Sequence, residues 1–217
     1  MRVEDVDFAQ QANTFWAVFT GAFLATVGGI VTTQTETRMR RRERERDAAL
    51  MFGEILNTLH VLIRLAGQTR GVGDPYGPIT MRMVRACRRE IDVYDRNRET
   101  LYELRDGRLR VSLHGLIVRI TMSVDGVLDA TAEITQVRAS LKTPGLSPDD
   151  RDETERSLTI MNERRDQGFD FILETGEEIP AIVARLGQIA RHTFQPYETG
   201  AGVGVVSVAT NPGQPDM

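Results

Sequence analysis

The sequence predicts an all-α protein in which a single N-terminal transmembrane helix continues into a cytoplasmic antiparallel bundle of the four-helix type, followed by a disordered tail. Three observations support this fold class: an uncharged apolar run near the N-terminus, an arginine-rich stretch directly after it, and apolar residues recurring every three or four positions beyond. With 217 residues in total, the part after the apolar run is long enough for one domain with a buried core.

The first predicted element is a transmembrane helix over residues 14–34. No charged residue occurs between Phe8 and Thr35, and residues 15–33 read FWAVFTGAFLATVGGIVTT. About 20 apolar residues cross a hydrocarbon core of ~30 Å as a helix, which also satisfies its own backbone hydrogen bonds in lipid. The alternative, a cleaved signal peptide, would need a basic segment before the run and a small-residue cleavage site after it, and the sequence shows neither.

The arginine distribution predicts the orientation of this helix. Arg2 alone precedes the helix, and six arginines closely follow it: Arg38, Arg40, Arg41, Arg42, Arg44 and Arg46. Because such basic flanks stay in the cytoplasm, residues 1–13 are expected to form a short tail outside and the C-terminal part to be cytoplasmic. The expected location is therefore the cell (inner) membrane, with the lipid bilayer as a partner and these arginines near anionic headgroups.

Small residues recur every four positions in the predicted membrane helix. Ala17, Gly21, Ala25 and Gly29 form one stripe of the kind that allows two helix backbones to approach closely in lipid. The stripe predicts self-association and hence a homo-oligomer. The alternative is a chance alignment, because Gly and Ala are common in membrane helices.

Residues 35–47 are predicted to continue the membrane helix as a charged juxtamembrane stalk. Charges alternate in sign from Glu36 to Asp47, and pairs such as Arg41 and Glu45 have the i,i+4 spacing that supports a solvated helix. A stop-transfer signal followed by an ordinary solvent-facing helix explains the same residues.

Residues 48–192 are predicted to form the bundle. The first apolar stripe runs from Ala48 to Ala66, a second begins near Pro78, and a third spans Ser112 to Lys142. The second carries Val84, Cys87, Ile91, Tyr94 and Leu101. Since no helix can bury its stripe alone, an up-down-up-down bundle is the economical arrangement, with a dimeric coiled coil as the alternative.

The residues of two connecting segments in this region predict where the neighbouring helices end or begin. The stretch 105–113 is either a helix end with Gly107 as its C-cap, which we favour, or a short hairpin. Ser147 and Pro148 are expected to open the fourth helix as its N-cap and first residue.

The fourth helix is predicted to run from Asp149 to Arg191, with a kink at Pro180 because proline deletes one backbone hydrogen bond. Residues 193–217 are rich in Gly and Pro and are predicted to form a flexible tail. Within them, the glycines of 200–204 are similar to those of a phosphate-binding loop, but no Lys-Ser/Thr follows, so a linker is expected.

The sequence shows no constellation typical of an active site. His60, His114 and His192 are its only histidines, and none belongs to a Glu-x-x-His or His-Glu-x-x-His motif. Cys87, the single cysteine, lies on an apolar stripe, as core cysteines do. We therefore predict no catalytic residue, no metal and no cofactor.

The charged residues bear on possible ligands and on the origin of the protein. Asp125, Asp129 and Glu133 line one helix face, where they could gather a cation or a partner, although a solvated outer face explains them as well. A net charge of −4 gives no basis for nucleic-acid binding. Lys142 is the only lysine, and this use of arginine is typical of GC-rich bacterial genomes.

Together these observations predict a membrane-tethered, non-enzymatic scaffold, adaptor or regulatory subunit with an unidentified protein partner. The alternatives are a membrane-active, pore-forming oligomer assembled through the small-residue stripe, and a signalling protein whose bundle senses a ligand.

Overall fold

The computed structural model describes residues 3–142 and 147–195, and between residues 3 and 33 it describes the backbone together with the side chain of Thr20. Within these ranges all regular structure is helical and no strand occurs, which confirms the all-α class. The elements in chain order are α1 (Val3–Arg70), α2 (Pro78–Arg96), the 3₁₀ helix η1 (Arg98–Glu103), α3 (Gly107–Ser140), α4 (Pro148–Gly176) and α5 (Ile179–Ala190).

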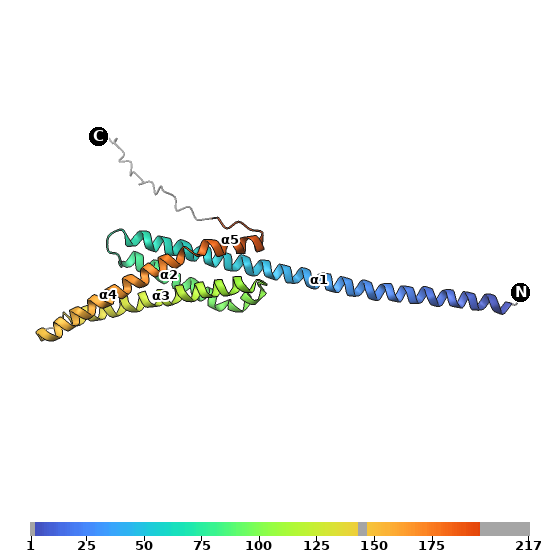
Figure 1. Cartoon of the computed structure of the whole chain (residues 1–217), viewed down its shortest axis with the longest axis horizontal. Helices are drawn as coiled ribbons and strands as arrows, with labels where there is room; N and C mark the ends of the chain where they lie inside the picture. The colour runs from blue at the N-terminus through green and yellow to red at the C-terminus, as the bar shows by residue number, and fades with distance from the viewer. Residues whose placement is uncertain (1–2, 143–146, 196–217) are drawn as a thin grey trace, which may run out of the picture.

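The helix α1 is a single rod of 68 residues whose two halves have different surroundings. Its N-terminal half projects beyond all the other elements (Figure 1). From Ala48 onward its apolar side chains enter the core, with Ala49 and Phe52 fully buried. The backbone thus joins the predicted membrane segment, the charged stretch and the first core helix without a break.

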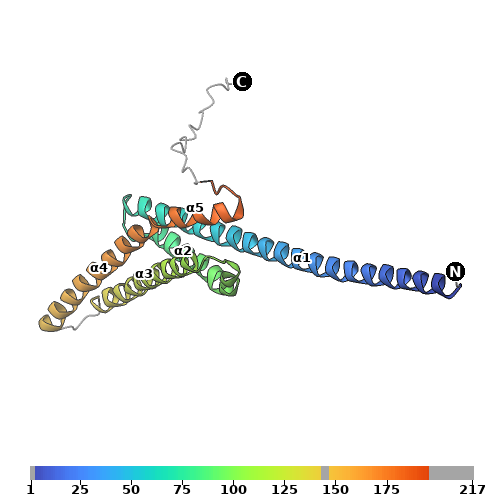
Figure 2. The same ribbon diagram turned by 45° about the vertical axis from the view of Figure 1, so that its right-hand side comes forward.

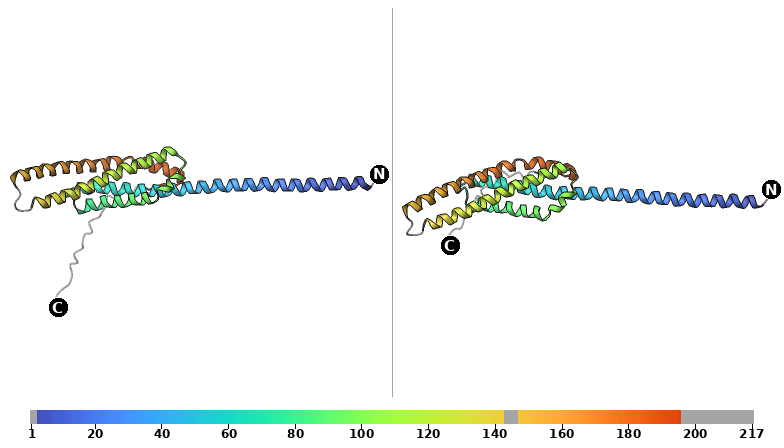
Figure 3. Two further views of the ribbon diagram at one scale, coloured as in Figure 1. Left: turned by 90° about the horizontal axis from the view of Figure 1, so that it is seen from below. Right: turned by 60° about the horizontal axis from the view of Figure 1, so that its bottom comes forward.

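The core lies where the other helices surround the second half of α1. α2 and α5 lie along α1, α3 packs along α4, and contacts between α2 and α3 connect the two groups (Figure 2). The far ends of α3 and α4 extend past the other helices as a two-helix projection (Figure 3). The stripes are buried within the one chain, and the largest fully buried side chains include Phe52, Leu59, Ile91, Tyr94, Leu113, Ile117 and Phe169.

Two of the described helical stretches are long and apolar enough to cross a membrane. They are Gln34–Arg70 and Gly107–Ser140, each of which contains an 18-residue segment with a mean hydropathy of 1.4. This is consistent with membrane association by length and composition, and core helices of soluble proteins share the same property. The segment 14–34 lies within the helical backbone of α1, but its side chains, apart from Thr20 and Gln34, lie outside the described residues.

The connection before α3 differs from the predicted one. Gly107 is the first residue of α3 and not the C-cap of a preceding helix. Asp106 is the N-cap, and its carboxylate accepts hydrogen bonds from the backbone N–H groups of Arg108 at 2.9 Å and Leu109 at 3.1 Å. An aspartate there satisfies two N–H groups that a helix start leaves without partners. The hairpin alternative is also wrong, because residues 107–113 are helical.

The fourth predicted helix is divided in two. α4 ends at Gly176, a turn follows at Glu177 and Glu178, and α5 begins at Ile179 with Pro180 in its first turn. Proline has no N–H to offer a helix interior, whereas in a first turn that N–H has no helical partner. Pro180 therefore starts a new helix instead of kinking a long one, and α5 lies beside α1.

The start of α4 agrees with the prediction. Ser147 is the N-cap, with its Oγ accepting a hydrogen bond from the Asp150 N–H at 3.2 Å, and Pro148 is the first helical residue. Asp149 and Asp150 place negative charge at the positive end of the helix dipole, which stabilises this end further.

The chain turns back over the core after α5. Arg191 adopts a left-handed conformation with φ 52° and ψ 42°, and the His192 N–H donates to the Gly187 carbonyl at 3.0 Å. Phe194, within the predicted flexible tail 193–217, is half-buried against the core. Residues 196–217, which include the glycines of 200–204, lie outside the described residues.

Candidate functional site

The six predicted juxtamembrane arginines are all exposed on α1: Arg38, Arg40, Arg41, Arg42, Arg44 and Arg46. The last two contact the rest of the domain. Arg44 lies 4.0 Å from the Glu103 carboxylate, and Arg46 donates to the Ala190 carbonyl at 3.4 Å. The charged stretch therefore meets the core at η1 and at the end of α5.

The predicted self-association face lies on the N-terminal half of α1. A helical backbone with four-residue spacing places Ala17, Gly21, Ala25 and Gly29 along one side of the rod. Their side chains are outside the described residues, so this face stays a prediction.

The three histidines lie in three separate environments. His60 Nδ1 is 3.2 Å from the Gly176 carbonyl, and His114 Nδ1 is 3.0 Å from the Tyr94 hydroxyl. The His192 ring packs edge-on against Phe194, with centroids 4.9 Å apart. Within residues 3–142 and 147–195, no three His, Cys, Asp or Glu side chains converge to hold a metal ion.

The predicted row of carboxylates on α3 is divided between two surroundings. Asp125 pairs with Arg88 of α2 at 2.9 Å. Asp129 and Glu133 instead line a groove of about 670 Å³ between α3 and α4. The three groups do not gather around one point, and the acidic row is therefore not a single site.

Cys87 is a core residue with 1% of its surface exposed. Burial raises the pKa of its thiol to about 12, so the group is protonated at neutral pH. Because the thiolate is the reactive form, this cysteine is chemically inert in the folded protein.

A cation–aromatic cluster that the sequence analysis missed holds the loop between α1 and α2 against α4. The buried guanidinium of Arg165 lies 3.5 Å from the centroid of the Tyr76 ring, and the Tyr76 hydroxyl donates to Asp166. Arg70, at the end of α1, pairs with Asp166 at 3.1 Å and also with Asp170. Burial, followed by the hydrogen bond to Asp166, raises the pKa of Tyr76. A lone tyrosine in a Gly/Pro-rich loop was the only signal for this contact.

The candidate functional site is a cavity of about 570 Å³ between α1, α5 and the turn after α5. Its apolar wall comes mainly from Ile179, Pro180 and Val183 of α5 and from the Phe194 ring. Cavities of this size with mostly apolar walls and a few polar groups are typical of small-molecule sites.

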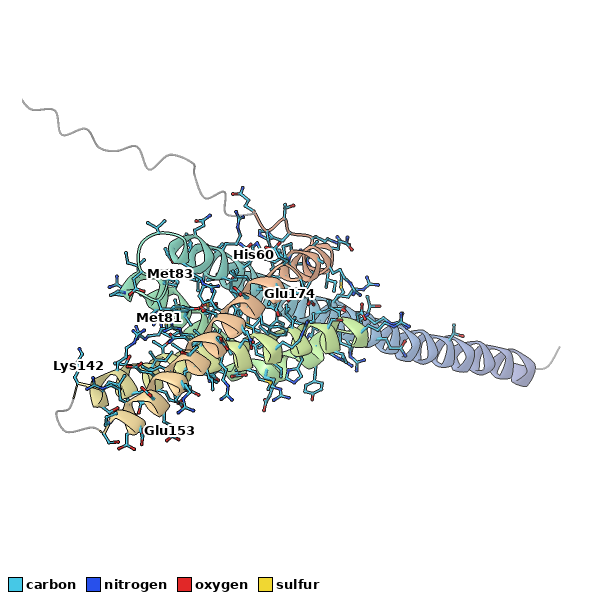
Figure 4. All side chains as sticks on the ribbon, turned by 60° about the vertical axis from the view of Figure 1, so that its left-hand side comes forward. His60, Met81, Met83, Lys142, Glu153 and Glu174 are labelled. Carbon is cyan, nitrogen blue, oxygen red and sulfur yellow. The ribbon has the colours of Figure 1, made fainter. Side chains whose placement is uncertain are left out.

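Six polar side chains line this cavity: Asn57, His60, Gln188, Arg191, His192 and Thr193. His60 lies on α1 beside the junction of α4 and α5 (Figure 4). Since a carbonyl can only accept, His60 Nδ1 carries a proton, which leaves Nε2 available as an acceptor when the ring is neutral. Arg191 is the only formally charged residue among the described residues that line the cavity.

Two glycines make room for the turn that follows α5. A Cβ added at Gly53 of α1 would lie 2.1 Å from Phe194 Cζ, and one at Gly187 of α5 would lie 2.7 Å from the His192 carbonyl oxygen. Each glycine stands in a helix interior, where glycine is unfavourable. Because glycine destabilises a helix interior, a glycine at such a position can indicate that another segment packs closely there.

Comparison with known proteins provides no relative: no protein-family model, no curated protein and no solved structure matches this chain. Its function is therefore inferred from the arrangement of its own residues. Two features carry that inference, the rod formed by α1 and the cavity between α1 and α5.

Proposed function

We propose that this chain is a single-pass membrane protein whose helical domain is an antiparallel bundle of the four-helix type. In this proposal it serves as a non-enzymatic scaffold, adaptor or regulatory subunit at the cytoplasmic face of the cell membrane. The observation that carries the proposal is α1, because one helix contains the apolar segment, the exposed arginines and the first core helix.

A continuous helix fixes both the distance and the direction of the domain relative to its anchor. At a rise of 1.5 Å per residue, the stalk of residues 35–47 places the core roughly 20 Å from the end of the membrane segment. The contacts of Arg44 with Glu103 and of Arg46 with Ala190 hold the core to the base of this stalk. A rod of this kind suits a protein that presents a surface at a set height above a bilayer.

The exposed arginines support the proposed orientation. An arginine at the centre of a membrane costs about 2.5–3.5 kcal/mol on insertion scales, so moving six of them across would cost on the order of 15–20 kcal/mol. The segment before the apolar run carries one arginine and is much easier to translocate. The bundle therefore stays on the side of the arginines.

Ion pairs between helices favour a rigid display surface over a mobile one. Arg119 of α3 makes a two-pronged pair with Glu178 before α5, at 2.7 and 2.6 Å. Asp106, the N-cap of α3, accepts from Arg185 of α5 at 2.5 Å. Charge-assisted hydrogen bonds of this geometry restrict the relative positions of neighbouring helices.

The orientation is tested by protease accessibility of a C-terminal tag in spheroplasts and in inverted membrane vesicles. The tag should be protected in spheroplasts and cleaved in inverted vesicles. Replacing Arg38, Arg40 and Arg41 with Gln should produce a fraction of inverted molecules. The matched control neutralises three exposed arginines of α4, Arg151, Arg156 and Arg164, which are too far from the membrane segment to influence its orientation. Cleavage of the wild-type tag in spheroplasts, or recovery of the chain in the soluble fraction, would contradict the proposal.

Homo-oligomer formation through the stripe of Ala17, Gly21, Ala25 and Gly29 is the second part of the proposal. Gly21→Ile or Gly29→Ile should weaken self-association, measured by energy transfer between labelled chains in lipid vesicles, because the larger side chain separates the backbones. Val27→Ile lies off the stripe and serves as the control. Equal energy transfer for all three variants would make the stripe incidental.

A further inference from the structure

The cavity between α1 and α5 is lined by apolar side chains in one part and by polar side chains in another. The walls supplied by Ile179, Val183 and the Phe194 ring are apolar. Arg191 and His192 stand where α5 finishes, and His60 stands near Gly176, where α5 is about to begin. A ligand with an apolar body against these walls and a polar head at Arg191 would match this lining.

The charged residues that line the cavity indicate which charge the polar head of the ligand should carry. Arg191 is a cation, and none of the described residues that line the cavity is Asp or Glu. A guanidinium is well suited to a carboxylate, which it can bind with two parallel N–H donors. An anionic head is therefore favoured over a neutral or cationic one.

The backbone of Arg191 gives an independent indication that its side chain is functional. Arg191 is the only non-glycine residue with a positive φ in the part of the chain that the structure describes. A left-handed residue after a helix is usually glycine, because a Cβ atom makes that conformation unfavourable. The turn would form more easily with glycine, so its left-handed conformation does not explain the arginine at this position.

We propose that this cavity binds a small amphipathic monocarboxylate, with its apolar chain along α5 and its carboxylate at Arg191. This activity goes beyond the scaffold function and does not depend on the membrane anchor. A bound ligand would contact α1, α5 and the turn that carries Phe194, and α1 and α5 also make the contact between Arg46 and Ala190.

The test uses the full chain in phosphatidylcholine nanodiscs and a decanoate that carries a photoreactive diazirine on its alkyl chain. Cross-linked peptides are identified by mass spectrometry after digestion. We expect label in the peptides that contain residues 57–60 and 179–194. Unlabelled decanoate should compete about tenfold better than decanol, because a hydrogen bond to a charged group contributes more than one to a neutral group.

Two variants test separately whether the ligand carboxylate binds Arg191 and whether the ligand occupies the cavity. Arg191→Gly keeps the left-handed turn and removes the cation, so decanoate should lose its roughly tenfold advantage over decanol. Ala184→Phe fills the cavity and should remove the label from residues 179–194. Ala181→Phe, on the same exposed stretch of α5 but outside the lining, is the matched control and should label like the wild type. Circular dichroism of each variant establishes that it is folded.

Three results would overturn the proposal. The first is label confined to the peptides of residues 3–33, which would report partition into the bilayer only. The second is unchanged cavity labelling in Ala184→Phe. The third is an unchanged preference for decanoate in Arg191→Gly. None of them bears on the orientation of the chain, which the protease experiment measures separately.

Discussion

The ring of Phe194 lies directly over the backbone of Gly53, in space that any larger residue at position 53 would occupy. A Cβ atom at Gly53 would be 2.1 Å from Phe194 Cζ and within 2.7 Å of two further ring atoms. The contact joins α1 to the turn after α5, and the Phe194 ring lines the cavity. Because glycine has no side chain, position 53 of α1 leaves room for the Phe194 ring to pack against the helix.

Gly53→Ala should lower the stability of the protein, whereas Gly126→Ala should raise it. Nothing lies within 4 Å of a Cβ at Gly126, so there alanine contributes only its better helix propensity, about 0.5–1 kcal/mol. At Gly53 the same change displaces the Phe194 ring and loses about 1–2 kcal/mol of burial. Thermal unfolding followed by circular dichroism measures both. In a Phe194→Ala background, Gly53→Ala should become stabilising; continued destabilisation there would show that the ring is not the cause.

Truncation of Tyr76 should be more damaging than removal of its hydroxyl. Tyr76→Phe loses the hydrogen bond to the charged Asp166 carboxylate, worth about 1.5–3 kcal/mol, but keeps the ring beneath Arg165. Tyr76→Ala also removes the aromatic face from a buried guanidinium whose Nε has no hydrogen-bond partner among the described residues, at a cost of about 2–4 kcal/mol. Urea unfolding measures the difference. Arg165→Met should restore part of the loss in Tyr76→Ala, because the buried charge is then gone. Equal effects of the two Tyr76 variants would contradict this role.

Stability should decrease on acidification through two carboxylates. Hydrogen bonds from the backbone N–H groups of Leu109 and Arg108, with the guanidinium of Arg185, lower the pKa of Asp106. A hydrogen bond from Arg119 lowers the pKa of Glu178. A lowered folded-state pKa means that the stabilisation is complete above the unfolded-state value, about 4, and is lost as the pH falls through the folded-state value.

The melting temperature measured between about pH 6 and pH 3 should therefore fall less steeply in Asp106→Asn than in the wild type, because asparagine is also an N-cap but does not titrate. Glu178→Gln should flatten the profile in the same direction. An equally steep profile in both variants would assign the acid sensitivity to other groups.

Cys87 should resist thiol reagents until the protein unfolds. Its pKa of about 12 leaves almost no thiolate at pH 8, and its side chain is buried. A Cys87→Ala/Met122→Cys variant supplies the control, since Met122 is 72% exposed and an ordinary cysteine has a pKa near 8.5. We expect the control to react with Ellman's reagent within minutes and Cys87 to react only in denaturant. Rapid reaction of Cys87 in the native protein would contradict the core packing of α2.

The sequence alone determined the elements whose signals are local. The apolar stripe predicted from Ser112 to Lys142 identified the buried face of α3, where Leu113, Ile117 and Ile120 are fully buried. Ser147 followed by Pro148 identified the start of α4 correctly. Such features are readable because helical periodicity and capping depend on residues within a few positions of one another.

Only the tertiary structure decided how these elements meet. Pro180 is compatible with a kink or with a new first turn, and packing of α5 along α1 selected the second. The contacts of Arg165 with Tyr76 and of Phe194 with Gly53 join residues distant in the chain, and periodicity carries no information about such pairs. The candidate cavity exists because α1, α5 and the left-handed turn at Arg191 come together in space, and close packing of distant side chains decides that arrangement.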